Sequence, residues 1–184
     1  YRIKYFLSLT FLFLVILNIP TILLFSYSTS LGSTFSYFMY FIGLLLILLN
    51  NKKYPDNLKV LFFISLLYYV ISAINYTGEF SVLLFEFIKY SVFIFALYTS
   101  QEFVGVKTIL FFVAIGSLTI LIDSLFFRFR DVVHDDFINE YGRYAGFYLN
   151  ANSAAAICLF GFSIALVIKS RIRMIILLFF SIMG

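Results

Sequence analysis

The sequence predicts an all-α fold, a polytopic bundle of transmembrane helices. The chain has 184 residues, of which 63% are hydrophobic and only 12% are charged. A soluble domain has about 25% charged residues, so this chain has too little polar surface to cover a core in water. Its apolar runs are continuous rather than alternating, which favours helices over the strands of a membrane barrel.

Seven apolar segments can be counted along the chain, joined on one side by short connections at 26–33 and 75–79. A transmembrane helix needs about 20 residues, and the second and sixth segments are slightly short. The chain does not begin with Met, and the sequence stops within the seventh apolar segment. We therefore expect one membrane domain, 1–184, truncated at the C-terminus. The segments cover residues 5–25, 34–49, 58–74, 80–98, 107–127, 153–168 and 174–184.

The basic residues predict the orientation, because cytoplasmic loops carry an excess of Lys and Arg. If the spans alternate, nine of the 13 basic residues fall on one side, Arg128, Arg130 and Arg143 fall on the other, and Lys89 lies inside a span. We therefore expect a cytoplasmic N-terminus and an extracytoplasmic loop at 128–152. The nine residues are Arg2, Lys4, Lys52, Lys53, Lys59, Lys107, Lys169, Arg171 and Arg173.

The loop at 128–152 is the longest connection, and long loops in compact proteins are usually functional or disordered. It is rich in aromatic and aliphatic residues, which argues against disorder. Val133, Phe137 and Tyr141 recur at helical spacing. This spacing predicts a short amphipathic helix on the outer membrane surface.

The end of this loop combines Arg143, Gly146, Asn150 and Asn152 before a small-residue helix expected from Ser153. A guanidinium offers two parallel donors to phosphate oxygens, and glycine allows close backbone approach. A helix N-terminus attracts anions, and Asn152 or Ser153 is a suitable N-cap. These features predict a binding site for a diphosphate. Contact with lipid headgroups, or an ion pair with a neighbouring glutamate, remains the alternative for Arg143.

Arg128 and Arg130 open the same loop and either contact the substrate or anchor the helix end at the headgroups. Asp123 precedes them inside the fifth segment. It can pair with Arg128 or act as a base, because an ionisable group within a span is a functional candidate.

Four further residues could have either a structural or a functional role. Glu86 and Lys89 share one helix face and form either a buried pair or a pair that lines a hydrophilic cavity. His134, the only histidine, stands among acidic residues that follow no known metal-ligand spacing. Cys158 is the only cysteine, so an internal disulfide and a Cys-based metal motif are excluded. We expect no metal and no cofactor, and the dispersed basic residues indicate no nucleic-acid partner.

The pattern Arg143-x-x-Gly146-x-x-x-Asn150-x-Asn152 resembles the start of the region shared by O-antigen ligases and O-antigen (Wzy-type) polymerases. Members of that family are polytopic glycosyltransferases. They move a sugar chain from undecaprenyl diphosphate to an acceptor sugar at the outer face of the bacterial inner membrane. The match covers about ten residues, and Ala151 stands where the family often has proline.

The resemblance implies an enzyme of surface polysaccharide biosynthesis, such as O-antigen in lipopolysaccharide, or capsule. Its partners would be the lipid bilayer, an undecaprenyl-diphosphate-linked glycan, and an acceptor glycan or lipid-linked sugar. The family's catalytic loop would follow Gly184, so we expect this stretch to be inactive alone and transfer no catalytic role to His134. A transporter or flippase of lipid-linked oligosaccharide, expected to have related halves with interrupted spans, remains the alternative, as does a structural membrane subunit.

Overall fold

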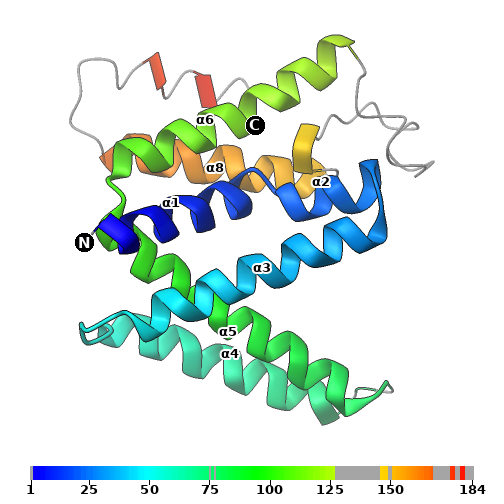
Figure 1. The fold of residues 1–184 in the computed structure, drawn as a ribbon, viewed down its shortest axis with the longest axis vertical. Helices are drawn as coiled ribbons and strands as arrows, with labels where there is room; N and C mark the ends of the chain where they lie inside the picture. The colour runs from blue at the N-terminus through cyan, green and yellow to red at the C-terminus, as the bar shows by residue number, and fades with distance from the viewer. Residues whose placement is uncertain are drawn as a thin grey trace.

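The computed structural model describes residues 2–74, 76, 78–126, 146–148, 151–167, 175–176 and 179–180. Within these residues the chain is helical and contains no strand, which confirms the all-α prediction. Figure 1 shows the helices stacked side by side; the first two run in the same direction, and those that follow alternate in direction. The elements are α1 (Arg2–Ile16), α2 (Ile19–Ser26), α3 (Thr29–Leu48), α4 (Asp56–Ile74), α5 (Phe80–Phe103), α6 (Val106–Phe126), the 3-10 helix η1 (Gly146–Tyr148) and α8 (Ala151–Val167).

Four helices are long and apolar enough to cross a membrane: α3, α4, α5 and the Val106–Asp123 part of α6. Helix α8 has 17 residues and α1 has 15, so both are shorter than a typical span. The protein is therefore a membrane protein by the length and composition of its helices. The expectation of about seven spans is not confirmed, and most of the seventh segment lies outside the described residues.

The expected first span, 5–25, is broken into α1 and α2. Pro20 explains the break, because proline has no N–H to donate to the carbonyl four residues earlier, and its ring clashes with that carbonyl. The carbonyl concerned belongs to Ile16, the last residue of α1. Asn18 turns the chain with φ 54° and ψ 34°, a left-handed conformation that asparagine tolerates better than most residues.

The connection expected at 26–33 is also shorter than predicted. Helix α3 begins at Thr29, and Ser28 caps it by accepting a hydrogen bond from the Leu31 amide at 3.2 Å. The cap therefore starts the helix five residues before the apolar run does. Gly32 allows α3 to approach α2 closely, since a Cβ there would lie 2.5 Å from the Leu24 Cα.

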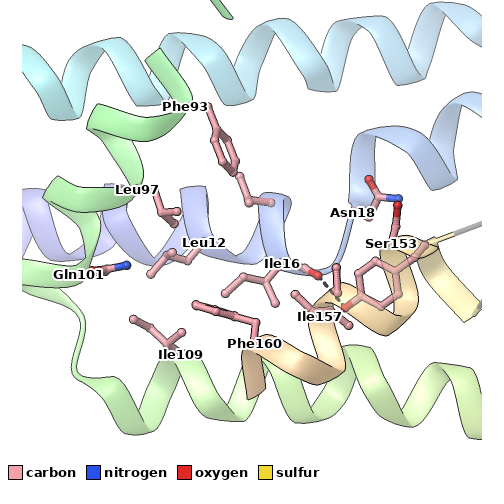
Figure 2. A pocket seen from close by; sticks show the side chains of 13 residues that line it. Leu12, Ile16, Asn18, Phe93, Leu97, Gln101, Ile109, Ser153, Ile157 and Phe160 are labelled. Atoms are coloured by element: carbon pink, nitrogen blue, oxygen red, sulfur yellow. Dashed lines mark hydrogen bonds between the residues drawn. The ribbon is translucent and has the colours of Figure 1, made fainter. Parts of the chain in front are cut away.

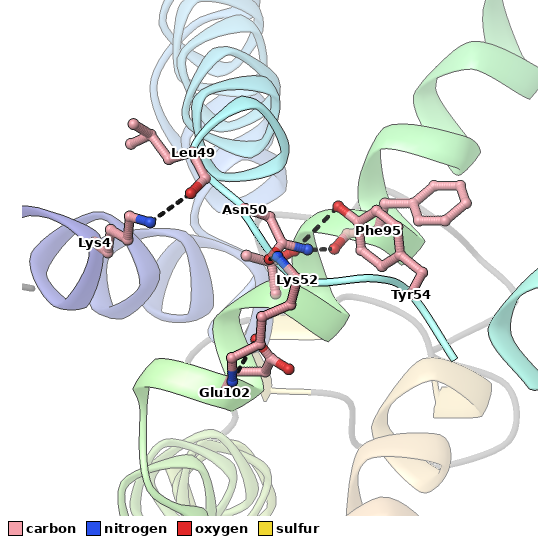
Figure 3. A network of polar contacts seen from close by, with 8 residues as sticks. Lys4, Leu49, Asn50, Lys52, Tyr54, Phe95 and Glu102 are labelled. Carbon is pink, nitrogen blue, oxygen red and sulfur yellow. Dashed lines mark hydrogen bonds and ion pairs between the residues drawn. The ribbon is translucent and has the colours of Figure 1, made fainter. Parts of the chain in front are cut away.

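The N-terminus of α1 lies at the same end of the bundle as the connections after α3 and α5 (Figures 1 and 3). Lys4 donates a hydrogen bond to the Leu49 carbonyl at 2.5 Å, and Lys52 pairs with Glu102 at 3.3 Å. We call this end, marked by Lys4 and Lys52, the basic end. The alternation of the helices agrees with the grouping of basic residues expected from the sequence, while the side of the membrane stays a prediction.

Helix α1 is the centre of the packing. One side, with Phe11, packs against Ile42 of α3 and Ala96 of α5. The other side, with Leu12, packs against Val113 of α6. Helix α4, by contrast, has no buried residue and contacts α5 at the edge of the bundle. The 3-10 helix η1, which precedes α8, contacts α6 and α2.

Candidate functional site: the end of the bundle at η1

Gly146 ties the predicted binding segment to α6. Its amide donates a hydrogen bond at 3.2 Å to the Oδ2 atom of Asp123, whose side chain is buried. Its φ is 55°, and a Cβ at this position would lie 2.7 Å from the Ile120 backbone nitrogen. Both the dihedral angle and the close approach require glycine. The predicted backbone freedom of Gly146 is confirmed, and its role in substrate binding stays a prediction.

Tyr148, two residues later, ties the same segment to the broken first span. Its hydroxyl donates a hydrogen bond at 2.9 Å to the Ile16 carbonyl, 132 residues earlier in the sequence. This is the carbonyl to which Pro20, having no N–H, cannot donate a hydrogen bond. Burial, with a smaller contribution from Cys158, raises the pKa of the Tyr148 hydroxyl. The hydroxyl therefore stays protonated and remains a donor at physiological pH.

The tyrosine ring fits because Gly116 of α6 leaves space for it. A Cβ at Gly116 would lie 3.1 Å from the Cζ atom of Tyr148. The ring is also packed with Ile120, Ala154 and Cys158. Together, Asp123 and Ile16 fix η1 from two directions, which positions the entry into α8.

A cavity of about 400 Å³ lies beneath this anchored segment (Figure 2). Asn18 and Ser153 line one end, Gln101 lies at the other end, and apolar side chains lie between them. An apolar site with a few polar groups is typical of ligand pockets. The irregular backbone at Asn18 is accommodated because it borders this cavity rather than lipid. The lining residues are Leu12, Val15, Ile16, Asn18, Phe93, Leu97, Gln101, Ile109, Tyr148, Ser153, Ala156, Ile157 and Phe160.

Helix α8 begins at Ala151, two residues before the expected start. Asn152 and Ser153 therefore lie in its first turn, and the expectation that one of them is the N-cap is wrong. The amides of this first turn have no partner within the helix and are donors at this end of the bundle. The side chain of Ser153 reaches the cavity, so the predicted segment and the cavity form one site.

The charged residues predicted to act here lie outside the described residues: Arg128, Arg130 and Arg143, together with Asn150 and His134. The amphipathic helix expected around Phe137 lies outside them as well. Asn152 is described only through the backbone of α8. The pairing of Asp123 with Arg128 is accordingly untested.

Sequence reasoning missed three residues of the site: Asn18, Pro20 and Tyr148. The signal for the first two was present, because an asparagine and a proline two residues apart within an apolar run indicate an interrupted helix. Tyr148 carried no comparable signal, because its partner is a backbone carbonyl far away in the sequence.

The Glu86–Lys89 pair lies elsewhere, on α5. The carboxylate and the ammonium are 2.6 Å apart, and their side chains are 52% and 29% exposed, respectively. Lys89 lines a second cavity, of about 470 Å³, between α3 and α5. The pair is not buried, and Lys89 lines the cavity while Glu86 is not among its lining residues, so neither interpretation drawn from the sequence fits in full.

Comparisons with models of protein families, with curated proteins and with solved structures give no match to this chain. The candidate function therefore depends on the residues and the geometry of the site.

Proposed function

We propose that this chain is part of a membrane glycosyltransferase that transfers a sugar chain from an undecaprenyl-diphosphate carrier to an acceptor sugar, as an O-antigen polymerase or ligase. The observation that carries the proposal is the double anchoring of η1. The contacts of Gly146 with Asp123 and of Tyr148 with Ile16 hold η1, the described part of the motif, beside the first turn of α8 and over the cavity.

The shape and lining of the cavity support a substrate that is apolar at one end and polar at the other. Its middle is lined by residues such as Leu97 and Ile157, which suit part of a hydrocarbon chain. Asn18 and Ser153 suit a polar group at the end nearest the motif. Arg143 is joined to the anchored Gly146 by three peptide units, which limits their separation to about 11 Å.

The proposed mechanism depends on stabilising the diphosphate leaving group. As the bond between the sugar and the diphosphate breaks, negative charge grows on the phosphate oxygens. Arg143 would bind two of those oxygens, and the first-turn amides of α8 would donate to others. Preorganised donors of this kind are often the largest catalytic contribution. Asp123 acts as a positioning residue, since its Oδ2 accepts the Gly146 amide. The proposal assigns the base that deprotonates the acceptor hydroxyl to no described residue.

The proposed setting is the bacterial inner membrane, with the basic end in the cytoplasm and η1 at the outer face. The connection at the basic end carries Lys52, which pairs with Glu102 and leaves Lys53 as additional positive charge. The excess of Lys and Arg at that end favours this orientation.

Transport of a lipid-linked oligosaccharide is the second candidate, and the broken first span favours it. Interrupted helices commonly form substrate sites in transporters. The break at Asn18 borders a cavity, as it would in such a site. The two candidates differ in where the lipid-linked substrate accumulates when the site is damaged.

The test is substitution of Arg143 in the full-length protein. We expect Arg143→Ala to reduce surface polysaccharide per membrane-inserted protein by about 10²–10³-fold, the usual effect of removing one preorganised donor. Arg143→Lys should also be poor, because lysine keeps the charge but loses the planar fork. Arg2→Ala, at the basic end, is the control and should retain normal product.

Near-normal product from Arg143→Lys would reject the phosphate role and leave Arg143 as a headgroup anchor. The side on which lipid-linked glycan accumulates separates the two candidates. In the Arg143→Ala strain, a membrane-impermeant lectin should label the accumulated glycan on intact spheroplasts if the chain is a transferase. Labelling only after lysis would favour the flippase.

A further inference from the structure

The second cavity, between α3 and α5, contains charge at a depth where a membrane offers none. Lys89 lies nine residues after the start of α5, about 14 Å along the helix axis. Ionisable groups inside a span are rare and usually mark a functional site. Glu86 accepts one of the three ammonium N–H groups, and the ammonium also lies 4.7 Å from the centre of the Phe85 ring.

Helix α3 presents four hydroxyl groups to the same cavity, from Ser33, Ser36, Tyr37 and Tyr40. Their spacing of three or four residues places them on one face of α3. Within the described residues, none of these hydroxyls makes a hydrogen bond. A hydroxyl that meets only hydrocarbon is unfavourable, so the face suits a ligand that is itself polar.

The charges decide between ligand classes. A plain acyl chain would leave the four hydroxyls and the remaining N–H groups of Lys89 without hydrogen-bond partners. An anion bound to Lys89 would lie close to Glu86, and two like charges 4 Å apart repel by about 4 kcal/mol at an effective dielectric constant of 20. An uncharged polyol avoids both penalties, because each of its hydroxyls can donate to Glu86 and accept from Lys89. The rings of Tyr37 and Tyr40 add flat surfaces that can pack against a sugar.

We propose that the cavity between α3 and α5 binds the uncharged sugar headgroup of an amphiphile that enters sideways from the membrane. Its chain lies along Leu44 and Ile88, which are 47% and 48% exposed and line the rim. This site is distinct from the cavity beneath η1, and it does not depend on the transferase activity proposed above.

The test uses the full chain in phosphatidylcholine nanodiscs and an alkyl glucoside that carries a photoreactive diazirine on its sugar. We expect crosslinks, mapped by mass spectrometry, on α3 and α5. Excess octyl glucoside should abolish them, whereas octanol and octyl phosphate should compete at least tenfold more weakly. Competition by octanol equal to that of octyl glucoside would overturn the proposal in favour of apolar binding. Stronger competition by octyl phosphate would overturn it in favour of an anion site.

Conservative variants provide the second measurement. Ser36→Ala and Tyr40→Phe each remove one hydroxyl without changing the packing, and each should weaken octyl glucoside competition about 2–12-fold, the usual net effect of one hydrogen bond. Glu86→Gln should shift the preference toward octyl phosphate, because the repelling charge is lost. Tyr68→Phe is the matched control, because Tyr68 is an exposed tyrosine of α4 that does not line the cavity. Competition unchanged in both hydroxyl variants would contradict the proposal.

Discussion

The α1–α2 segment and helix α4 differ in how the hydrogen bonds of their backbone carbonyls are made. Helix α4 is uninterrupted over 19 residues, so its backbone hydrogen bonds are made within the helix, and none of its residues is buried, although Phe62 and Tyr69 contact Phe87 of α5. The α1–α2 segment is interrupted inside the protein, and one of its carbonyls, that of Ile16, depends on Tyr148. A continuous helix needs only apolar side chains, whereas a broken one needs particular residues elsewhere in the chain.

This difference has a consequence for the site. The residue that satisfies the break belongs to η1, the segment that leads into α8. The break, the anchored segment and the cavity between them are therefore one structural unit. Substitutions in α4 should change this unit little, and substitutions at the anchors should change it strongly.

The largest stability effect is expected at Gly146. Gly146→Ala places a side chain at φ 55° and against the α6 backbone, and should destabilise the protein by at least about 1–3 kcal/mol. Gly105→Ala is the matched control, since a Cβ there meets nothing within 4 Å. Denaturation of both variants in mixed micelles measures the difference. Equal stability of the two variants would mean that η1 is not held on α6.

A medium effect is expected at Tyr148. Tyr148→Phe keeps the ring and leaves the Ile16 carbonyl without its donor, which should cost about 1–2 kcal/mol. Tyr68→Phe removes the same hydroxyl from an exposed tyrosine of α4 and should be neutral. Hydrogen exchange at the amides of η1 should rise only in the first variant. A similar rise in both would show that the contrast between the two regions is unfounded.

The smallest effect is expected at the basic end. Lys59 and Asp56, at the start of α4, are 53% and 91% exposed in their ion pair, and solvent screens such pairs, so Lys59→Met should leave the free energy of unfolding nearly unchanged. The same micelle denaturation measures it. A loss larger than that of Tyr148→Phe would reverse the order proposed for the two ends of the bundle.

The continuous helices were predictable because hydropathy alone determines them. The expected segments 58–74 and 107–127 match α4 and α6 to within two residues. Helix α3 was predicted too short because its first turns are polar and depend on the Ser28 cap. A hydropathy scale does not detect such N-caps.

The site was less predictable, for a different reason. The sequence indicated that Gly146 needs backbone freedom, but not that its amide donates to Asp123, because the two residues are 23 positions apart in the sequence and no local pattern links them. The break at Pro20 was readable from the residue type and was obscured by the apolar residues around it. The partner of the freed carbonyl required the tertiary structure.

The role of Tyr148 at the break is tested by a double-mutant cycle that combines Pro20→Ala with Tyr148→Phe. Alanine at position 20 supplies an N–H for the Ile16 carbonyl, which should then need the tyrosine hydroxyl less. We predict that Tyr148→Phe costs about 1–2 kcal/mol with Pro20 present and less than about 0.5 kcal/mol in the Pro20→Ala background. An equal cost in both backgrounds would contradict the claim that Tyr148 stabilises the break in the first span.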